Sequence, residues 1–500
     1  MKQGARKSRQ LGTFTLPSGQ TMMGELAIAG PKTALYLHSR EPLVLNQPLG
    51  AITGILQDLT RVSLINCAPS EQSHMMRGEE ISYYANVFPH FVILGDRHLD
   101  PHKPTVDSVE FAMGDAAILF RDVDAFGWAS EPGRLIEQIV GNRPSTPQRR
   151  VVIGPDPQIV YFTGKREVFS TQTAMGRVSA WHSLPPFPNF DGGIRLRNNV
   201  RVVVDFGQAI DFYDAVSRVT RVIEYVGLIV GRPQNLRALD IRLASDGEVP
   251  LYLRVHWSLS PRRDVRTEWG ARPSTFDLLL DPCRAPEEFA GVLERWFSCQ
   301  DMRHDARWRF FNSFARQRQY DIDRLVGSAN MFDILPDSVF PASAAISEEL
   351  REAQANSRAV FRALPQSLER DSVLGALGRV GKLALKHKVR ARAEVVIKCA
   401  GEWFEDLCLV AGEGVNCRNY YVHGGDARLD YYRNTAAVDF FTDTLEFVFA
   451  ASDLIDAGWD IKSWIKQGTT MTHPFGRYRA SYPKALQEFR TLLQKSEPTP

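Results

Sequence analysis

Long hydrophobic runs are absent from this chain of 500 residues, and cysteine is scarce. No stretch approaches the ~20 apolar residues that a helix needs to cross a bilayer, so the sequence predicts no membrane-spanning helix. The basic N-terminus is not followed by an apolar segment, which argues against a secretory signal. The six cysteines include no Cys-x2-Cys pair and no regular spacing. We therefore predict free thiols in a reducing cytoplasm rather than a disulfide framework.

A strong charge of one sign is also missing. Lysine and arginine total 60 and aspartate and glutamate total 58, which gives a formal net charge of +2. Because no overall field attracts nucleic acid, any contact with RNA has to come from a local patch. The length exceeds what one hydrophobic core usually supports, and it predicts two to four domains.

Residues 10–140 are predicted to form a β-rich domain. Short alternating or apolar segments are separated there by turns that contain glycine and proline. The Gly30-Pro31-Lys32-Thr33 segment lacks the spacing of a phosphate loop, and we predict no nucleotide cofactor. Histidines and aspartates crowd residues 90–102, but no second ligand cluster completes a zinc site. We therefore interpret this segment as a polar turn and predict no metal site.

A mixed middle region is predicted at 150–330, and a helical module is predicted at 335–490. Within the middle region, strand-like segments alternate with helical patterns; the strands are predicted at 236–243, 250–257 and 276–280, and the helices at 209–231 and 286–299. Because no catalytic constellation is evident there, the region is interpreted either as a sensing region or as a scaffold. The predicted fold class is α+β multidomain, with a β-rich N-terminal half, a mixed middle region and a C-terminal all-α bundle.

Two segments mix basic residues with other patterns. Six arginines alternate with aromatic residues at 303–327. Such a segment either binds single-stranded RNA or buries its aromatic face and leaves the arginines in solvent. Further along the chain, Lys382, Lys386 and Arg390 share one helical face at i, i+4 and i+8. This face is a weak RNA-binding candidate, and a solvated helix face is the alternative.

Arg418 and His423 lie five residues apart in the last third of the chain, with Asn419 directly after the arginine. A histidine can take the proton from a ribose 2′-OH, and an arginine can neutralise charge on the attacked phosphate. An asparagine can hold a ribose or phosphate oxygen. Tyr420 and Tyr421 can stack on a base beside such a site. None of these steps requires a metal.

The Arg-x4-His spacing alone is a weak signal. It occurs three times, as Arg97/His102, Arg177/His182 and Arg418/His423. On an ideal helix a step of five residues turns by ~140°, so a shared site requires a helix end, a bend or a second chain.

Context favours the third copy, because it lies between two apolar stripes of helical period, at 389–410 and 437–455. The first stripe is predicted to end at Gly412 and Gly414, and Asn416 is predicted to cap a new helical turn that carries the motif.

A polar Arg-Asn...His group between two core helices resembles the HEPN domain. The hallmark of that domain is Arg-x4-6-His, often with a polar residue after the arginine. The N-terminal segments LPSGQTMMGELAIAG, ALYLHS, ITGILQDLTRVSLINC and YYANVFPHFVILGDRHLD resemble the N-terminal domain of ApeA-like proteins. Those are bacterial anti-phage abortive-infection factors that end in a HEPN domain. The two resemblances cover about residues 12–130 and 335–490 and support each other.

The resemblance implies a metal-independent endoribonuclease of the HEPN type, acting as a toxin-like effector of abortive infection. It implies that Arg418, Asn419 and His423 are catalytic, that RNA is the substrate, and that the chain forms a homodimer through the HEPN domain and responds to a phage-encoded trigger. The alternative is a non-catalytic HEPN scaffold that binds RNA or protein, with the β-rich half as a sensing region. The two differ in whether Arg418 and His423 lie in an open groove or are buried and hydrogen-bonded internally.

Overall fold

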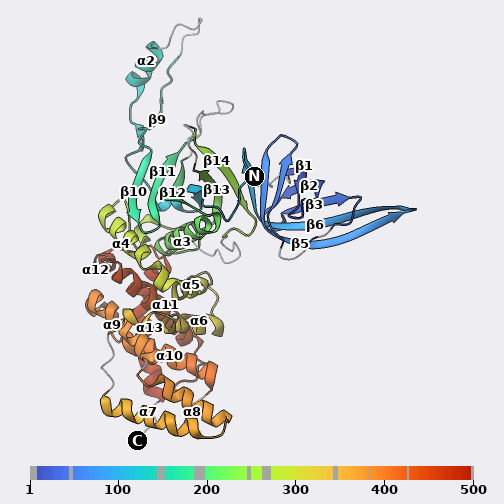
Figure 1. Cartoon of the computed structure of the whole chain (residues 1–500). Coiled ribbons are helices and arrows are strands. Elements are labelled where there is room, and N and C mark those ends of the chain that lie inside the picture. Colours follow the sequence, from blue (N-terminus) through green and yellow to red (C-terminus); the bar gives the residue numbers. More distant parts are fainter. Residues whose placement is uncertain are drawn as a thin grey trace. The chain divides into compact units, whose positions relative to one another are not determined.

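The computed structural model describes residues 8–43, 45, 49–142, 152–184, 198–244, 249–261, 272–341, 347–381, 383–424 and 427–496. The chain forms two compact units. The first comprises Met1–Gly227, Gln234–Arg263 and Asp281–Ala290; the second comprises Leu228–Pro233, Asp264–Leu280 and Gly291–Pro500. The described strands lie in the first unit, and most helices lie in the second (Figure 1). The predicted fold class is confirmed, whereas the domain boundaries at 10–140, 150–330 and 335–490 stay predictions.

Six strands near the N-terminus close into an antiparallel barrel, in the order β6-β3-β2-β1-β4-β5, with β5 paired back to β6. They are β1 (Ser8–Thr15), β2 (Thr21–Ile28), β3 (Ala34–Ser39), β4 (Ile52–Leu56), β5 (Arg61–Arg77) and β6 (Glu80–Gly95). Alternate side chains fill the interior, among them Phe14, Leu26 and Leu64. A Cβ at Gly54 would lie 2.6 Å from Cδ1 of Phe14, so this crossing of strands requires glycine.

Strand β6 links the barrel to a second set of strands. It pairs with β14 and with β3 along the same edge, and the sheet continues in the order β14-β13-β7-β12-β11-β10. The bounds are β7 (Val106–Met113), β10 (Glu167–Thr173), β11 (Gly176–Ser183), β12 (Asn199–Ile210), β13 (Leu236–Leu243) and β14 (Leu251–Trp257). The strands predicted at 236–243 and 250–257 are thus confirmed, and the predicted N-terminal and middle regions share one sheet.

Shorter elements complete the first unit. They are η1 (Gly30–Lys32), α1 (Ala116–Leu119), β8 (Phe126–Ala129), α2 (Gly133–Gly141) and β9 (Ile159–Phe162), and β8 and β9 form a separate two-stranded sheet. The helix predicted at 209–231 is confirmed as α3 (Phe212–Val230). Its first residue packs edge-on against Phe91 of β6, with the ring centroids 5.1 Å apart.

The second unit is helical. Its elements are η3 (Thr275–Asp277), α4 (Pro286–Ser298, shared with the first unit), α5 (Gln300–Phe314), α6 (Ile322–Asp333), η4 (Asp337–Val339), α7 (Glu348–Ala363), α8 (Leu368–Arg379), α9 (Leu385–Ala400), η5 (Gly401–Phe404), α10 (Leu407–His423), α11 (Thr435–Asp456), α12 (Ile461–Lys466) and α13 (Pro474–Ser496). Helix α11 is buried along most of its length and forms the core against which α6, α9 and α10 pack.

The helix predicted at 286–299 is confirmed as α4, but the strand predicted at 276–280 is wrong.

A buried carboxylate explains that missing strand. Asp277 ends a short 3-10 turn, and its two oxygens accept hydrogen bonds from backbone and hydroxyl groups of Thr470 and Thr472 and from the hydroxyl of Thr469. Burial alone would raise the pKa of this carboxyl, but these hydrogen bonds outweigh it and lower the pKa well below its usual range. A short apolar run such as 276–280 does not reveal such a long-range contact.

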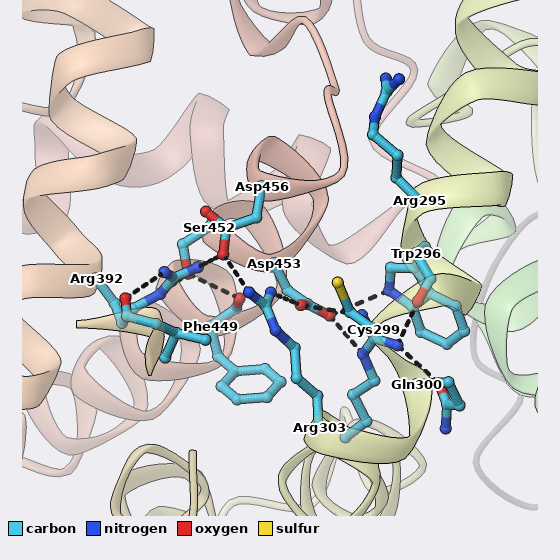
Figure 2. Close-up of polar contacts among 12 residues, drawn as sticks. Arg295, Trp296, Cys299, Gln300, Arg303, Arg392, Phe449, Ser452, Asp453 and Asp456 are labelled. Atoms are coloured by element: carbon cyan, nitrogen blue, oxygen red, sulfur yellow. Dashed lines mark hydrogen bonds and ion pairs between the residues drawn. The ribbon is translucent and has the colours of Figure 1, made fainter. Parts of the chain in front are cut away.

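Three of the six arginines in segment 303–327 are buried. For these three, both interpretations are wrong, because a buried arginine neither binds RNA nor lies in solvent. Arg303, Arg307 and Arg324 are 7%, 2% and 1% exposed. Figure 2 shows the group around Asp453 of α11. Asp453 pairs with Nη1 of Arg303 and accepts from Nε of Arg307 at 2.8 Å, and it also accepts from Nε1 of Trp296 at 3.1 Å. The Arg307 guanidinium stacks over the Trp296 ring, 3.8 Å from its centroid.

This ionic group extends to a fourth helix. Asp456 accepts from Nη2 of Arg303 at 2.8 Å and from Nη2 of Arg392 at 2.7 Å. Arg392 is 3% exposed, and its Nε donates to Oγ of Ser452 at 3.0 Å. Burial by itself would raise the pKa of the Asp453 carboxyl, but the charges of Arg307 and Arg303 lower it to about 2. The network therefore joins α4, α5, α9 and α11. Each buried charge in it is neutralised by a partner, and loss of one partner would leave the other buried and uncompensated.

A second buried ion pair fixes α6 to α11. The Arg324 guanidinium donates to both oxygens of Glu446, each at 2.8 Å, and to Oδ1 of Asp443 at 3.1 Å. Ser328, one turn further along α6, donates to Oε1 of Glu446 at 3.1 Å. Two successive turns of α6 are thus tied to the core helix by charge-assisted hydrogen bonds.

We expect His473 to make the fold sensitive to acid. This histidine is fully buried; its Nε2 lies 2.9 Å from the carbonyl oxygen of Leu228, and its Nδ1 accepts from the backbone N–H of Phe475 at 3.0 Å. Burial lowers its pKa to about 4. The unfolded state therefore binds a proton first as the pH falls. The histidine should reduce the free energy of unfolding by about 3 kcal/mol between about pH 6.5 and pH 4.

The measurement is the drop in Tm of the full chain between about pH 7.5 and about pH 5. His473→Gln should show a smaller drop than the wild type, although it starts less stable, whereas replacement of the exposed His304 should leave the drop unchanged. Asp443, whose pKa burial raises to about 6, acts in the opposite direction in all three proteins and cancels in the comparison. Equal drops in wild type and His473→Gln would contradict the prediction.

Among the helices in the described ranges, none combines the length and apolarity needed to cross a membrane.

Candidate active site

Helix α10 carries the whole Arg-Asn...His group, and His423 is its last residue. Gly412 and Gly414 lie inside this helix, where α10 packs closely on its neighbours; a Cβ at Gly414 would lie 3.1 Å from Cδ1 of Leu445 on α11. The predicted helix end at these glycines and the predicted cap at Asn416 are therefore wrong. The preceding helix ends earlier, at Gly401, where the backbone adopts φ of +73°.

The guanidinium of Arg418 brings three polar side chains together. Its Nη1 atom lies 3.0 Å from Oδ1 of Asn419 and 3.0 Å from Nε2 of His423. Its Nη2 atom donates to Oδ1 of Asn330, on α6, at 2.8 Å. Because a guanidinium only donates hydrogen bonds, Nε2 of His423 is the acceptor here, and we assign the ring proton to Nδ1.

Arg418 and His423 can meet despite their spacing of five residues because His423 lies at the end of the helix. His423 closes α10, and Gly424 follows it with φ of +68°, a backbone conformation that favours glycine. The long side chain of Arg418 spans the remaining rotation around the helix. His423 and Asn419 are exposed and Arg418 is half-buried, so solvent reaches the polar group.

Glu413, one and a half turns before Arg418, organises the neighbouring face of α10. It is 1% exposed; its Oε1 accepts from the hydroxyl of Tyr431 at 2.7 Å, and its Oε2 accepts from Nδ2 of Asn416 at 2.9 Å. Oδ1 of Asn416 in turn accepts from Nζ of Lys386 at 3.1 Å. Burial and the Glu413 carboxylate raise the pKa of Tyr431 far above its usual value, so the tyrosine keeps its proton.

Four tyrosines gather at the C-terminal end of α10. The ring centroids of Tyr420 and Tyr421 are 5.3 Å apart, and that of Tyr432 lies 6.2 Å and 5.7 Å from them. Tyr431 is buried, Tyr420 and Tyr421 are half-buried, and Tyr432 is 68% exposed. The predicted stacking of Tyr420 and Tyr421 on a base stays a prediction, and Tyr432 joins them as the most accessible ring.

The three cations predicted to share one face differ in their surroundings. Lys386 is exposed and contacts Asn416, as described above. Arg390 is also exposed, but its Nε pairs with Oε1 of Glu394 at 3.0 Å. Lys382 lies outside the described residues. Their role in RNA binding stays a prediction.

Sequence reasoning missed two residues of this site. Asn330 lies 88 positions before Arg418, and no spacing rule connects them. Glu413 did carry a signal, because it is a carboxylate directly flanked by the two glycines of an otherwise apolar helical segment. A buried carboxylate in such a position needs partners, which the structure provides as Tyr431 and Asn416.

The other two Arg-x4-His copies are arranged differently. Arg177 pairs with Asp205 at 3.3 Å, whereas His182 is buried and its Nδ1 lies 2.8 Å from Nδ2 of Asn198. In the first copy, the ring of His102 lies 5.4 Å from that of Tyr213. Only the third copy has a hydrogen bond between its arginine and its histidine among the contacts of the described residues.

The histidines of segment 90–102 contact other groups. Nδ1 of His98 lies 3.2 Å from the carbonyl oxygen of Val62, and Nε2 of His90 accepts from Nε1 of Trp257 at 2.9 Å. Across the described ranges, no three His, Cys, Asp or Glu side chains gather in a way that would hold a metal ion.

Comparisons with known families match two parts of the chain. The family described as ApeA N-terminal domain 1 matches residues 10–296, more than half of the chain. The family described as Apea-like HEPN matches residues 326–462, which include Asn330 and the whole of α10. No curated protein and no solved structure matches the chain. Membership of these families implies a HEPN effector of anti-phage defence with a function of the ribonuclease type. The chain belongs to the ApeA family and carries an ApeA-like HEPN domain.

Proposed function

We propose that this protein is a metal-independent endoribonuclease that acts as the effector of anti-phage abortive infection. The observation that carries the proposal is the contact of 3.0 Å between Nη1 of Arg418 and Nε2 of His423, at a solvent-exposed helix end inside the HEPN region. A general base and a cation that can bind phosphate lie within one hydrogen bond of each other there.

In the proposed reaction, Nε2 of His423 takes the proton of a ribose 2′-OH. The 2′ oxygen attacks the adjacent phosphorus, and the bond from phosphorus to the 5′ oxygen breaks. Arg418 stabilises the negative charge that develops on the phosphate, and Asn419 orients the scissile group. The leaving 5′ oxygen takes a proton from solvent, and His423 releases to solvent the proton that it accepted. The products are a 2′,3′-cyclic phosphate, or the 3′-phosphate formed when water hydrolyses it, and a 5′-OH.

The hydrogen bond between Arg418 and His423 has to break before His423 can act as a base. In the free chain the lone pair of Nε2 accepts a hydrogen bond from Arg418, so it does not face a substrate hydroxyl. A bound phosphate competes for the same guanidinium, because it is a stronger, charged acceptor. Binding of the RNA backbone would therefore move Nη1 toward the phosphate and leave Nε2 ready to act as the base.

Residues along α10 suggest the course of the RNA. Lys386 lies beside Asn416, and Asn416, Asn419 and His423 follow one another along one exposed or half-exposed stripe of the helix. Lys386 would bind a backbone phosphate, with Arg390 and Lys382 as further candidates from the same segment. Tyr420, Tyr421 and the exposed Tyr432 would stack on a base next to the scissile bond.

The proposal includes a cytoplasmic homodimer formed through the HEPN domain and a phage-encoded trigger sensed by the β-rich half. The alternative, a non-catalytic scaffold, draws support from Arg418, which is half-buried and hydrogen-bonded to three side chains of its own chain. The exposure of His423 and Asn419 favours the enzyme, because a purely structural polar cluster does not need to face solvent.

We expect the purified full chain to cleave end-labelled single-stranded RNA in the presence of EDTA. Because the 2′ oxygen is the nucleophile, the fragments should carry 2′,3′-cyclic phosphate or 3′-phosphate ends and 5′-OH ends. The 5′ ends are identified by whether polynucleotide kinase labels them without prior phosphatase treatment. Fragments with 5′-phosphate ends, or cleavage that EDTA abolishes, would refute this mechanism.

A further inference from the structure

The side chain that holds Arg418 in place comes from a different helix. Oδ1 of Asn330, in the last turn of α6, accepts from Nη2 of Arg418 at 2.8 Å. Both residues are half-buried. The opposite end of the same guanidinium, Nη1, faces Asn419 and His423 on α10. The planar fork is thus bound from two sides, which leaves it one orientation relative to His423.

Asn330 lies on a helix, α6, that is firmly attached to the core helix α11. Two turns earlier on α6, Arg324 is bound to both oxygens of Glu446 on the core helix α11, and Ser328 binds the same carboxylate. Arg324 is 1% exposed and Ser328 is fully buried, so this attachment is shielded from solvent. The position of the Asn330 amide is therefore set by the buried contacts between α6 and α11 rather than by its own half-buried surroundings.

The amide has a chemical advantage over a carboxylate at this position. Its oxygen accepts one hydrogen bond from the guanidinium but carries no charge. An aspartate there would form an ion pair with Arg418 and offset the positive charge that the phosphate requires. An alanine would leave a long arginine side chain with several accessible rotamers and no fixed partner on α6.

We propose that Asn330 is a positioning residue. It holds the Arg418 guanidinium next to His423 and leaves the positive charge of the guanidinium available to a phosphate. The inference rests on the proposed ribonuclease function, because it assigns Asn330 a role in orienting that site. It also makes a claim about the free chain, namely that Asn330 restrains Arg418 whether or not RNA is bound.

The test compares Asn330→Ala and Asn330→Asp with the wild type and with Asn312→Ala, which replaces an exposed asparagine on α5. Two readouts are taken on the full chain: the kcat and KM of RNA cleavage, and the rate at which phenylglyoxal modifies Arg418, followed by peptide mass spectrometry. Asn330→Ala should lower kcat by about 10- to 100-fold with little change in KM, because the guanidinium is misplaced. It should also speed the modification of Arg418 several-fold.

Asn330→Asp separates positioning from charge. It should keep Arg418 slow to react, because the carboxylate still holds the guanidinium, and yet it should lower kcat. Asn312→Ala should match the wild type in both readouts, and all variants are compared by Tm. If Asn330→Ala leaves kcat and the reactivity of Arg418 unchanged, the inference is refuted. If the wild type cleaves no RNA, the proposed function fails, but the reactivity of Arg418 still decides whether Asn330 restrains it.

Discussion

Replacement of His423 by alanine is expected to slow RNA cleavage by about 10²- to 10⁴-fold, the usual contribution of a positioned general acid or base. The side chain is exposed at the end of α10, so its removal should change the free energy of unfolding by less than about 0.5 kcal/mol. The loss of activity would therefore be chemical rather than structural.

The measurement is single-turnover cleavage with excess protein, combined with protection of bacteria against phage and a thermal melt of each variant. His387→Ala is the matched control, because His387 is an exposed histidine on α9 of the same unit. Wild-type cleavage and protection by His423→Ala would remove this residue from the mechanism and move the search for function to the β-rich half.

Arg418→Ala extends the same prediction. Loss of a group that stabilises charge in the transition state typically slows a reaction by about 10²- to 10³-fold. Because Arg418 and His423 contact each other and serve one step, their effects should not multiply in the double variant. Arg351→Ala, at an exposed position of α7 in the same unit, should retain wild-type activity. Independent, multiplying losses would indicate that the two side chains do not act in the same step.

Replacement of Asp453 by alanine is expected to have the largest effect on stability, a loss of about 3–5 kcal/mol in the free energy of unfolding. Asp453 is the shared anion for two buried arginines, Arg303 and Arg307, and it also accepts from Trp296. Its removal leaves Arg307 buried without an anionic partner among those contacts, whereas Arg303 keeps Asp456. An uncompensated buried charge is far more costly than the loss of a salt bridge at the surface.

The check is urea unfolding of the full chain, followed by tryptophan fluorescence because Trp296 lies in the network. Asp305→Ala, at an exposed position of α5, serves as the control and should change stability by less than about 0.5 kcal/mol. If Asp453→Ala does not fold, Asp453→Asn provides a milder test, because the amide keeps one acceptor oxygen but no charge. A midpoint equal to that of the wild type for either variant would show that the network is not a source of stability.

The spacing of apolar residues predicted the presence of the helices better than the residues at which they end. The stripe at 389–410 has helical period throughout, yet the structure divides it between α9 and α10 at Gly401. Gly412 and Gly414 looked like the natural stop, since glycine weakens a helix. They are kept inside α10 because the packing against α11 leaves little room for a Cβ at Gly414. Tertiary packing outweighed the intrinsic preference of glycine.

Charge counting was least informative in segment 303–327. A sequence shows that arginines alternate with aromatic residues, but it does not show which carboxylates will meet them. The partners of Arg307 and Arg324 are Asp453 and Glu446, more than a hundred positions away on α11. Whether an arginine is solvated, bound to RNA or buried in an ion pair is therefore decided only when α5, α6 and α11 pack together.

The sequence by itself determined the order of β-rich and helical regions, the family resemblance and the Arg-Asn...His group. These depend on periodicity and on residues close together in the chain, which local rules read well. Only the tertiary structure decided that Arg418 reaches His423 at a helix end, that Asn330 holds it from α6, and that Glu413 fixes Tyr431 beside it. The physical reason is that side-chain hydrogen bonds and buried ion pairs form between positions that are far apart in sequence. Their geometry exists only after the apolar faces of the helices have packed.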